Sequence, residues 1–346
     1  MLSSSILCCC WPTRHKLNAF RGTCLGARLL LCASILLLSL PVRAEWFTET
    51  QSKMGTRIEV QLWHDDAAVA GTLISEAMAE FDRIEDAMST YRADSEITYI
   101  NNTAAEKPVR VGPELFGLID RALQLSSTTS GAFDITYDSV GQLYDYRINA
   151  RPSEAEIENW ITAVDYRYVR LNPETSEIRY ARPGVRINLG GIAKGHAVES
   201  VIALLRAAGI EHAMAAAGGD TRLLGKRGEN PWIVGIRDPD DEDGFVTRLA
   251  LDDEAISTSG DYERFFDEDG VRYHHILNPS TGKSAGELRS VTIIGPDATM
   301  TDGLSTSVFV LGTKDGLALI ESLEDYEAVI VDTEHRVVFS TGLDPR

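Results

Sequence analysis

The sequence predicts a mixed α/β, or α+β, fold in one large body, with a helical first half and a sheet-rich second half. Segments with the apolar spacing of helices dominate residues 65–163. Short alternating segments, separated by Gly, Pro and Asn turns, follow from Tyr166 onward. No repeat, low-complexity tract or evident linker interrupts the chain after residue 44, so we expect a single body over residues 45–346.

Residues 1–44 are typical of a secretory signal peptide. A basic stretch without acidic residues precedes the apolar run Leu29–Leu40, and the small residue Ala44 follows. The apolar run is short for a membrane span, so we expect cleavage after Ala44. An uncleaved membrane anchor is the alternative.

Cysteine content and charge narrow the functional class. Five of the 33 basic residues and none of the 52 acidic ones lie in residues 1–44, so the remaining chain has a net charge of −24. This charge disfavours a nucleic-acid partner, and an anionic ligand needs a lysine, a helix N-terminus or a metal ion nearby. Export without disulfides indicates a bacterial periplasm. All cysteines lie in the leader: Cys8, Cys9, Cys10, Cys24 and Cys32.

The helical half is predicted from periodicity and capping residues. Alternation predicts a strand over residues 53–63, and apolar spacing predicts a long amphipathic helix over 65–90. Capping and turn residues predict further helices over 95–101, 114–129 and 153–163.

The sheet-rich half contains many short alternating segments. Helices are predicted over 196–208, 298–311 and 317–323. A hairpin turn is expected at residues 267–270. The predicted strands are 168–171, 177–180, 185–189, 212–216, 221–225, 232–237, 248–251, 255–259, 263–266, 271–276, 288–294, 327–332 and 337–340.

The stretch INLGGIAKGHAVES, from Ile187 to Ser200, is a candidate phosphate site. It is not a P-loop, because His196 follows the second glycine and Lys194 precedes it. A strand, a glycine turn and a helix start still offer free N–H groups to an anion, with Lys194 beside them. A tight turn with a surface lysine is the alternative.

Asp302 and Thr306 are four residues apart in a predicted helix and therefore share one face. A carboxylate and a hydroxyl together suit Mg²⁺ or Ca²⁺ rather than zinc. The alternative is an aspartate that offsets the helix dipole beside a packed threonine.

Two further stretches carry candidate chemistry. His274 and His275 point to opposite faces of a strand, so only one can face a site, where it could act as a general base. In SGAFDITYD, Phe133 and Asp134 could stack on and hydrogen-bond a planar ring. Ordinary strand residues are the alternative in both places.

Taken in order, these motifs resemble the ApbE family of FAD:protein FMN transferases, over nearly all of residues 45–346. No single motif is specific, whereas the ordered set is. The matching pieces are MGT at Met54, MSTYRADSEI at Met88, SGAFDIT at Ser130, INLGGIAKG at Ile187, AAGGD at Ala216, ISTSGDYERFF at Ile256, YHHILNPSTG at Tyr273 and the helix around Asp302.

The resemblance implies a single domain of the ApbE, T-fold-like type and a Mg²⁺-dependent reaction. Members move FMN from FAD onto a Ser or Thr hydroxyl of a target protein and release AMP. A Mg²⁺-dependent FAD pyrophosphatase and a non-catalytic exported FAD-binding protein are the alternatives. The implied acceptors are subunits of membrane redox complexes, such as sodium-pumping quinone reductase or Rnf-type assemblies, on the outer face of the inner membrane.

The resemblance also implies site residues. His275 is the expected general base, with Asp302 as the alternative. The metal ligands would be Asp302, Thr306 and a backbone oxygen at Gly191, with Ser305 contributing directly or through water. Many relatives have Asp in place of Asn188, a change that removes a charge and keeps an acceptor. The flavin site would be lined by Met54, Tyr91, Ala132, Phe133, Asp134, Asn188, Lys194 and Ile276.

Overall fold

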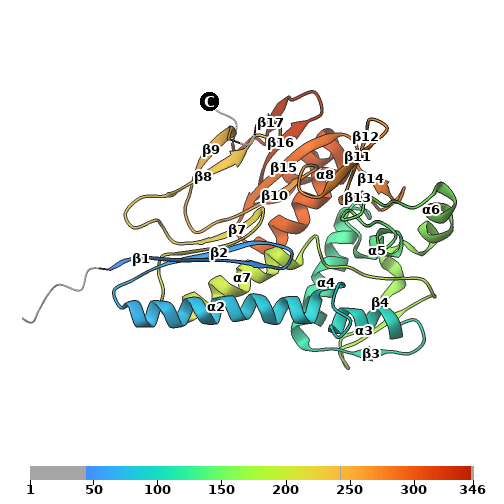
Figure 1. The fold of residues 1–346 in the computed structure, drawn as a ribbon, viewed down its shortest axis with the longest axis horizontal. Coiled ribbons are helices and arrows are strands. Elements are labelled where there is room, and N and C mark those ends of the chain that lie inside the picture. Colours follow the sequence, from blue (N-terminus) through green and yellow to red (C-terminus); the bar gives the residue numbers. More distant parts are fainter. Residues whose placement is uncertain (1–43, 242, 344–346) are drawn as a thin grey trace, which may run out of the picture. The chain divides into compact units, whose positions relative to one another are not determined.

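An eight-stranded antiparallel sheet organises the chain in the computed structural model, which describes residues 44–241 and 243–343 (Figure 1). The signal peptide predicted over residues 1–44 lies outside the described residues except for Ala44. The strand order is β1-β2-β6-β7-β10-β15-β16-β17, and every neighbouring pair is antiparallel. The strands are β1 (Glu45–Lys53), β2 (Thr56–His64), β6 (Ala213–Ala217), β7 (Asp220–Leu224), β10 (Ala255–Gly260), β15 (Leu288–Gly295), β16 (Glu327–Asp332) and β17 (Val337–Phe339).

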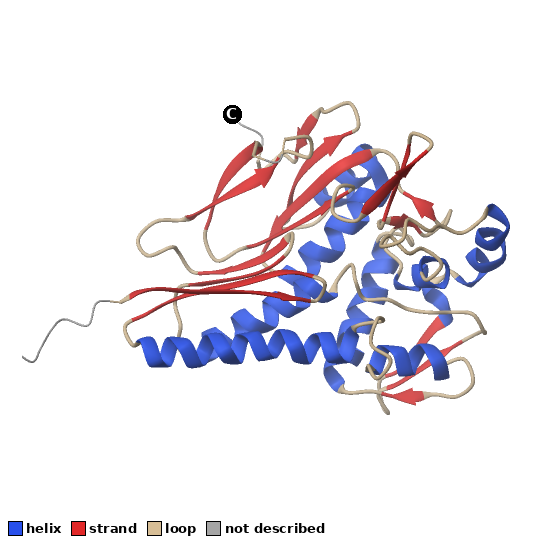
Figure 2. Cartoon of the chain, in the orientation of Figure 1, coloured by secondary structure: helices blue, strands red, loops and turns tan. Residues whose placement is uncertain are grey.

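Three long helices pack against this sheet (Figure 2): α2 (Ala67–Met88), α7 (Ala193–Ala207) and α8 (Ala298–Glu321). Helix α2 begins where the Asp66 side chain accepts hydrogen bonds from two backbone N–H groups. Its fully buried Phe81 contributes about 2 kcal/mol through burial alone. In β2, Ile58, Val60 and Leu62 alternate inward, which explains how one face of the strand meets the helices. Within the described residues, no helix combines the length and apolar character that a membrane span needs.

A three-stranded sheet with the order β3-β5-β4 lies within residues 96–180, a region that also contains helices. The six strands that remain in the described part of the chain form three two-stranded hairpins. The helices of this region are α3 (Glu96–Thr103), α4 (Pro113–Thr128), α5 (Asp138–Gly141) and α6 (Glu154–Trp160), with 3₁₀ turns η1 (Ile135–Tyr137), η2 (Ile161–Ala163) and η3 (Tyr166–Tyr168). The remaining strands are β3 (Val109–Arg110), β4 (Val169–Asn172), β5 (Glu177–Tyr180), β8 (Trp232–Arg237), β9 (Phe245–Leu251), β11 (Phe265–Glu268), β12 (Val271–His274), β13 (Leu277–Asn278) and β14 (Lys283–Ser284).

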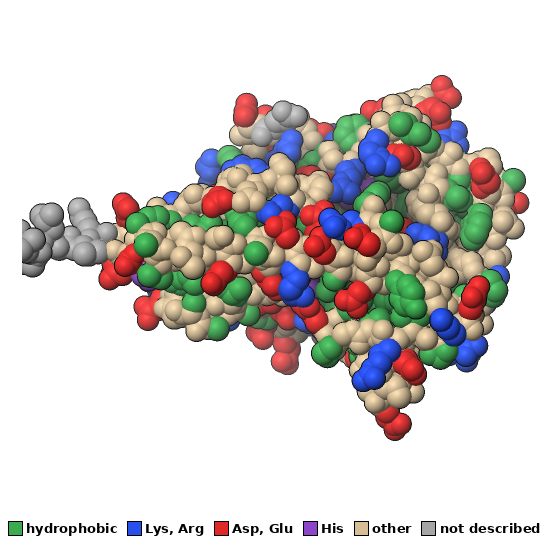
Figure 3. Space-filling view, turned by 60° about the horizontal axis from the view of Figure 1, so that its bottom comes forward, with side chains coloured by type: hydrophobic (Ala, Val, Ile, Leu, Met, Phe, Trp, Pro, Cys, Tyr) green, Lys and Arg blue, Asp and Glu red, His purple; other side chains and the backbone are tan. Residues whose placement is uncertain are grey.

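Acidic and basic side chains lie interspersed on the face drawn in Figure 3. Among the described residues, many acidic and basic side chains form ion pairs at the surface, such as Arg83 with Glu80 and Glu114. Such pairs contribute little to stability individually, because water screens them.

The predicted α+β fold in one body is confirmed, but several predicted elements are wrong. Residues 185–189 form no strand, because the backbone of Ile187 bonds to the Asn101 side chain (2.8 and 2.9 Å) instead of to a neighbouring strand. The start of a strand, the alternative for the stretch SGAFDITYD, is not formed either, because residues 130–133 form a turn that leads into η1 and α5.

Other boundaries shift. The sequence prediction missed β1, and β11 begins at Phe265 rather than at residue 263. Helix α7 begins at Ala193 rather than at His196. The two helices predicted over 298–311 and 317–323 join into α8 across a kink at Gly312. The φ of Gly312 is 78°, a positive value that glycine adopts readily because it has no Cβ.

Candidate functional site

A cavity of about 490 Å³ opens where the motifs converge. The end of α2, the glycine turn before α7, strand β10, the segment after β12 and helix α8 all contribute to its walls. The sequence-predicted residues on its lining are Met54, Tyr91, Ala132, Phe133, Asp134, Asn188, Gly191, Lys194, His275, Ile276, Asp302 and Thr306. The structure therefore brings all but Ser305 together at one cavity, although their roles remain predictions.

Asp302 is the buried acidic centre of the cavity. One of its carboxylate oxygens accepts a hydrogen bond from Gly195 N–H at 2.9 Å, and the other lies 3.6 Å from Lys194 Nζ. Burial and the nearby Asp220 carboxylate raise the pKa of Asp302 above its usual range, against the effect of Lys194. The buried carboxylates of Asp302 and Asp220 thus share the ammonium group of Lys194. A divalent cation would offset the negative charge that this one ammonium group leaves on the two carboxylates.

Thr306 lies one turn along α8 from Asp302, as the spacing predicts, and close to the glycine turn. A Cβ placed on Gly191 would lie 3.3 Å from Thr306 Oγ1. Thr306 Oγ1 also lies 3.4 Å from Ser259 Oγ. The Thr306 hydroxyl and the Asp302 carboxylate therefore line one corner of the cavity beside the glycine turn, and a carbonyl ligand at Gly191 stays a prediction.

Ser305 differs from the other predicted ligands because it does not line the cavity. Its hydroxyl donates to the Asp302 carbonyl (2.9 Å) and lies 2.8 Å from Ser259 Oγ. The structure thus gives Ser305 a link to Thr306 through Ser259, and direct metal ligation by Ser305 stays a prediction.

The oxygen-only donor set fits a hard cation such as Mg²⁺. Among the described residues, no group of three or more His, Cys, Asp and Glu side chains could hold a metal ion. A cation at this corner would therefore depend on the Asp302 carboxylate, the Thr306 hydroxyl and the carbonyl at Gly191.

Lys194 lies in the first turn of α7 and forms an ion pair with Asp220 at the start of β7. Although burial opposes its charge, the Asp220 and Asp302 carboxylates raise the pKa of Lys194 above its ordinary value. Lys194 is therefore held as a cation at the cavity wall. Asp220 was not among the predicted site residues, although the motif AAGGD ends on it.

His275 and His274 separate as strand alternation predicts. His274 is buried, and its Nε2 donates to the Ala285 carbonyl at 2.7 Å. His275 lines the cavity, and its Nδ1 has no hydrogen-bond partner among the described residues. Burial, with Arg264 nearby, lowers the pKa of His275 to about 3, so its imidazole is neutral at ordinary pH.

The flavin-side residues differ in how free they are to meet a ligand. Tyr91 is 75 % exposed, while Phe133 and Ile276 are buried in the wall. Both carboxylate oxygens of Asp134 accept protein hydrogen bonds, from Thr136 (2.8 Å) and from Tyr166 N–H (2.8 Å). Asp134 thus caps η1, and its contact with a flavin ring stays a prediction.

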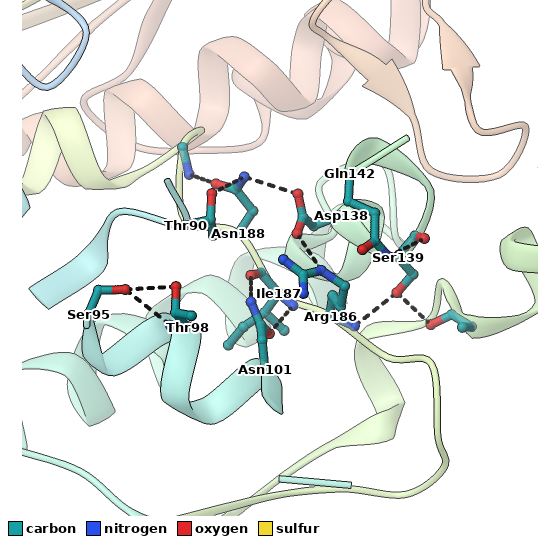
Figure 4. Close-up of polar contacts among 12 residues, drawn as sticks. Thr90, Ser95, Thr98, Asn101, Asp138, Ser139, Gln142, Arg186, Ile187 and Asn188 are labelled. Atoms are coloured by element: carbon teal, nitrogen blue, oxygen red, sulfur yellow. Dashed lines mark hydrogen bonds and ion pairs between the residues drawn. The ribbon is translucent and has the colours of Figure 1, made fainter. Parts of the chain in front are cut away.

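The side chain of Asn188 lies between Thr90 and Asp138, which come from two other motifs (Figure 4). Its Oδ1 accepts from Gly190 N–H at 2.8 Å, and its Nδ2 donates to Asp138 at 3.1 Å and to Thr90 at 3.3 Å. Burial raises the pKa of the Asp138 carboxyl, while Asn188 and Arg186 oppose this shift. Sequence reasoning missed Asp138 and Thr90, because nothing local to either residue signals this contact.

Arg264 is another missed cavity residue. It lines the wall and donates to the Gly55 carbonyl at 3.2 Å, which ties the start of β11 to the turn after β1. The arginine lies within the motif ISTSGDYERFF, so the motif marked the segment but not the side chain.

Comparison with known proteins gives the family. The ApbE family model matches residues 54–330. An FAD:protein FMN transferase of Vibrio cholerae is 32% identical over 317 residues, covering 88% of this chain and 94% of the relative. One from Treponema pallidum is 32% identical over 324 residues, covering 88% and 89%.

Solved structures agree with these relatives. The ApbE protein of Thermotoga maritima superposes with a TM-score of 0.81 at 32% identity, covering 86% of this chain and 98% of that one. The flavin transferase ApbE from Vibrio cholerae superposes with a TM-score of 0.78 at 28% identity, covering 88% and 99%. This chain therefore belongs to the ApbE family.

Proposed function

We propose that this chain transfers FMN from FAD to a Ser or Thr hydroxyl of a target protein, with Mg²⁺ bound, and releases AMP. The observation that carries the proposal is a single cavity in a member of the ApbE family. It brings together the proposed oxygen ligands Asp302 and Thr306, the ion-paired Lys194 and the neutral His275. The names of its relatives, FAD:protein FMN transferase, support the same activity.

The atoms balance as a phosphoryl transfer. The acceptor hydroxyl oxygen bonds to the FMN-side phosphorus, and the bond from that phosphorus to the bridging oxygen breaks. The hydroxyl proton goes to a base, and AMP leaves with the bridging oxygen and its electron pair. Because AMP is a stabilised anion, the leaving group needs little acid assistance.

Asp302, Thr306 and the carbonyl at Gly191 would hold the cation. When bound, Mg²⁺ would neutralise charge on the phosphoryl oxygens. Lys194 would offset part of the charge of the pyrophosphate, in a chain whose own net charge is strongly negative.

His275 is the proposed base for the acceptor hydroxyl. Its imidazole is neutral and can accept a proton, and the side chain lines the cavity. Asp302 is the alternative base, because its raised pKa also suits it to take a proton.

We also propose that the chain is exported to a bacterial periplasm and cleaved after Ala44. Strand β1 begins at Glu45, directly after the proposed cut, which supports a folded domain that starts there. Expression of the full chain should give an exported product whose N-terminal residue is Glu45. A product that keeps the leader would favour the alternative of an inner-membrane anchor.

The acceptors we propose are subunits of membrane redox complexes of the sodium-pumping quinone reductase or Rnf type. The test incubates residues 45–346 with FAD, Mg²⁺ and such a subunit, and weighs all products. A subunit that gains the mass of FMN, together with free AMP, supports the transferase. Free FMN and AMP with an unmodified subunit would indicate a pyrophosphatase, and unchanged FAD would indicate a binding protein.

A further inference from the structure

One side-chain amide, that of Asn188, joins three separate segments of the cavity wall. Asn188 Nδ2 donates to Asp138 Oδ1 in α5 and to Thr90 Oγ1 after α2, at 3.1 and 3.3 Å. Asn188 Oδ1 accepts from Gly190 N–H in the glycine turn at 2.8 Å (Figure 4). Since all four residues line the cavity, the amide couples its walls directly.

The partners of Asn188 allow only one orientation of this amide. A carboxylate can only accept a hydrogen bond, and a backbone N–H can only donate one. If the amide were flipped, its oxygen would face the Asp138 carboxylate and its NH₂ group would face Gly190 N–H. Asp138 therefore selects the orientation in which Asn188 can hold the glycine turn.

Asp138 is itself fixed. It is 5 % exposed, and its Oδ2 accepts from Arg186 Nε at 3.2 Å. The adjacent Ser139 hydroxyl accepts from Arg186 N–H at 3.0 Å, which holds the two segments together at a second point. The carboxylate cannot move away from Asn188 without giving up its ion pair with Arg186.

The glycine turn has little room. A Cβ placed on Gly191 would lie 3.3 Å from both Phe133 Cε2 and Thr306 Oγ1. A shift of the turn by as little as about 1 Å would therefore change how its backbone is directed toward the cation corner, the part of the cavity lined by Asp302 and Thr306. The hydrogen bond from Gly190 N–H to Asn188 restrains this shift.

We propose that Asp138 is a positioning residue for flavin transfer: it orients the Asn188 amide, which holds the Gly190–Gly191 turn in the geometry that binds the substrate. This inference rests on the proposed function, because FAD is taken as the ligand of the cavity.

The test exchanges the two side chains. Many relatives carry Asp at position 188, but in this chain the buried Asp138 carboxylate faces that position at 3.1 Å. Asn188→Asp therefore places carboxylate oxygens in contact here and should weaken FAD affinity at least about tenfold. In the double variant D138N/N188D, the amide now at position 138 can donate to the carboxylate now at position 188, and the amide oxygen can accept from Arg186 Nε. The contact between the two positions is restored with donor and acceptor exchanged, and Gly190 N–H keeps its acceptor. FAD affinity should therefore return to within about threefold of the wild-type value.

The measurement is FAD affinity by quenching of flavin fluorescence without Mg²⁺, for the wild type, both single variants and the double variant. Thermal unfolding of each protein without FAD checks that it folds. Asn172→Asp is the matched control, because it adds the same charge at the exposed end of β4 and should leave affinity unchanged.

Wild-type affinity in N188D, or a double variant no better than N188D, would overturn the positioning role. Equal losses from N172D and N188D would also overturn it, because the effect would then be one of net charge. A wild-type chain that binds no FAD even after Mg²⁺ is added would overturn the proposed function instead. In that event the four unfolding temperatures still decide whether Asp138 and Asn188 are energetically coupled.

Discussion

The roles of single atoms in the cavity can be separated by conservative substitutions. Thr306 combines a hydroxyl that lines the cavity with a methyl group that lies beside the glycine turn at Gly191. Thr306→Ser keeps the hydroxyl and Thr306→Val keeps the shape. We expect T306S to behave like the wild type and T306V to need about 10–100-fold more Mg²⁺ for half-maximal transfer. A Mg²⁺ titration of FMN transfer measures this, and equal behaviour of the two variants would contradict a cation-binding hydroxyl.

His275 can be tested at the same scale. Because its imidazole is neutral and half-buried in the cavity wall, His275→Gln should leave FAD binding intact. The transfer rate should fall by about 10²–10⁴-fold, the usual contribution of a general base. Single-turnover transfer and FAD affinity are measured side by side. If the rate is unchanged, the base is another group, and Asp302 is the next candidate.

At the scale of elements, the sequence predicts those whose pattern is local. The apolar stripe of α2 and the alternation of β2 are visible in the chain. Residues 185–189 have the same alternation, but their backbone is bound by the Asn101 side chain from α3. That contact joins residues far apart in the chain, and no local pattern carries it.

The close packing of α7 on α8 gives an element-scale prediction. A Cβ on Gly195 would lie 2.7 Å from Asp302 Cβ and would clash with the Ala298 carbonyl. Gly195→Ala should therefore lower the free energy of unfolding by about 2–3 kcal/mol. Gly71→Ala in α2 is the matched control, because nothing lies within 4 Å of its added Cβ, and it should stabilise by about 0.5–1 kcal/mol. Equal effects in denaturant unfolding would contradict the packing argument.

For the whole molecule, the order of motifs predicts which residues share the cavity, but not how they are connected. Lys194, His275 and Asp302 were predicted from their motifs, whereas Asp220 and Asp138 were missed. Both missed aspartates are buried acids whose partners lie far away in sequence. Burial of a charge depends on the complete fold, so a single sequence gives no direct sign of it.

The buried histidines make the stability of the whole chain depend on pH. Burial lowers the pKa of His274 to about 4, from an ordinary value of 6.5. Below pH 6.5 His274 therefore binds a proton in the unfolded chain but stays neutral in the folded chain until the pH approaches 4. The contribution of neutral His274 is complete above pH 6.5 and is lost as pH falls towards 4, by about 3 kcal/mol at most. Buried aspartates with raised pKa values, such as Asp138, act in the opposite direction.

Comparison with a variant isolates the histidine term. In His274→Gln the side chain no longer titrates, and its amide can still donate to the Ala285 carbonyl. The wild type should lose more stability than H274Q between pH 7 and pH 4.5 in denaturant unfolding. Phe309→Leu is the control, because its ring contacts His274 edge-on and its loss weakens the core without removing the imidazole. F309L should keep the wild-type pH slope, whereas parallel curves for the wild type and H274Q would show that burial of His274 does not govern the acid response.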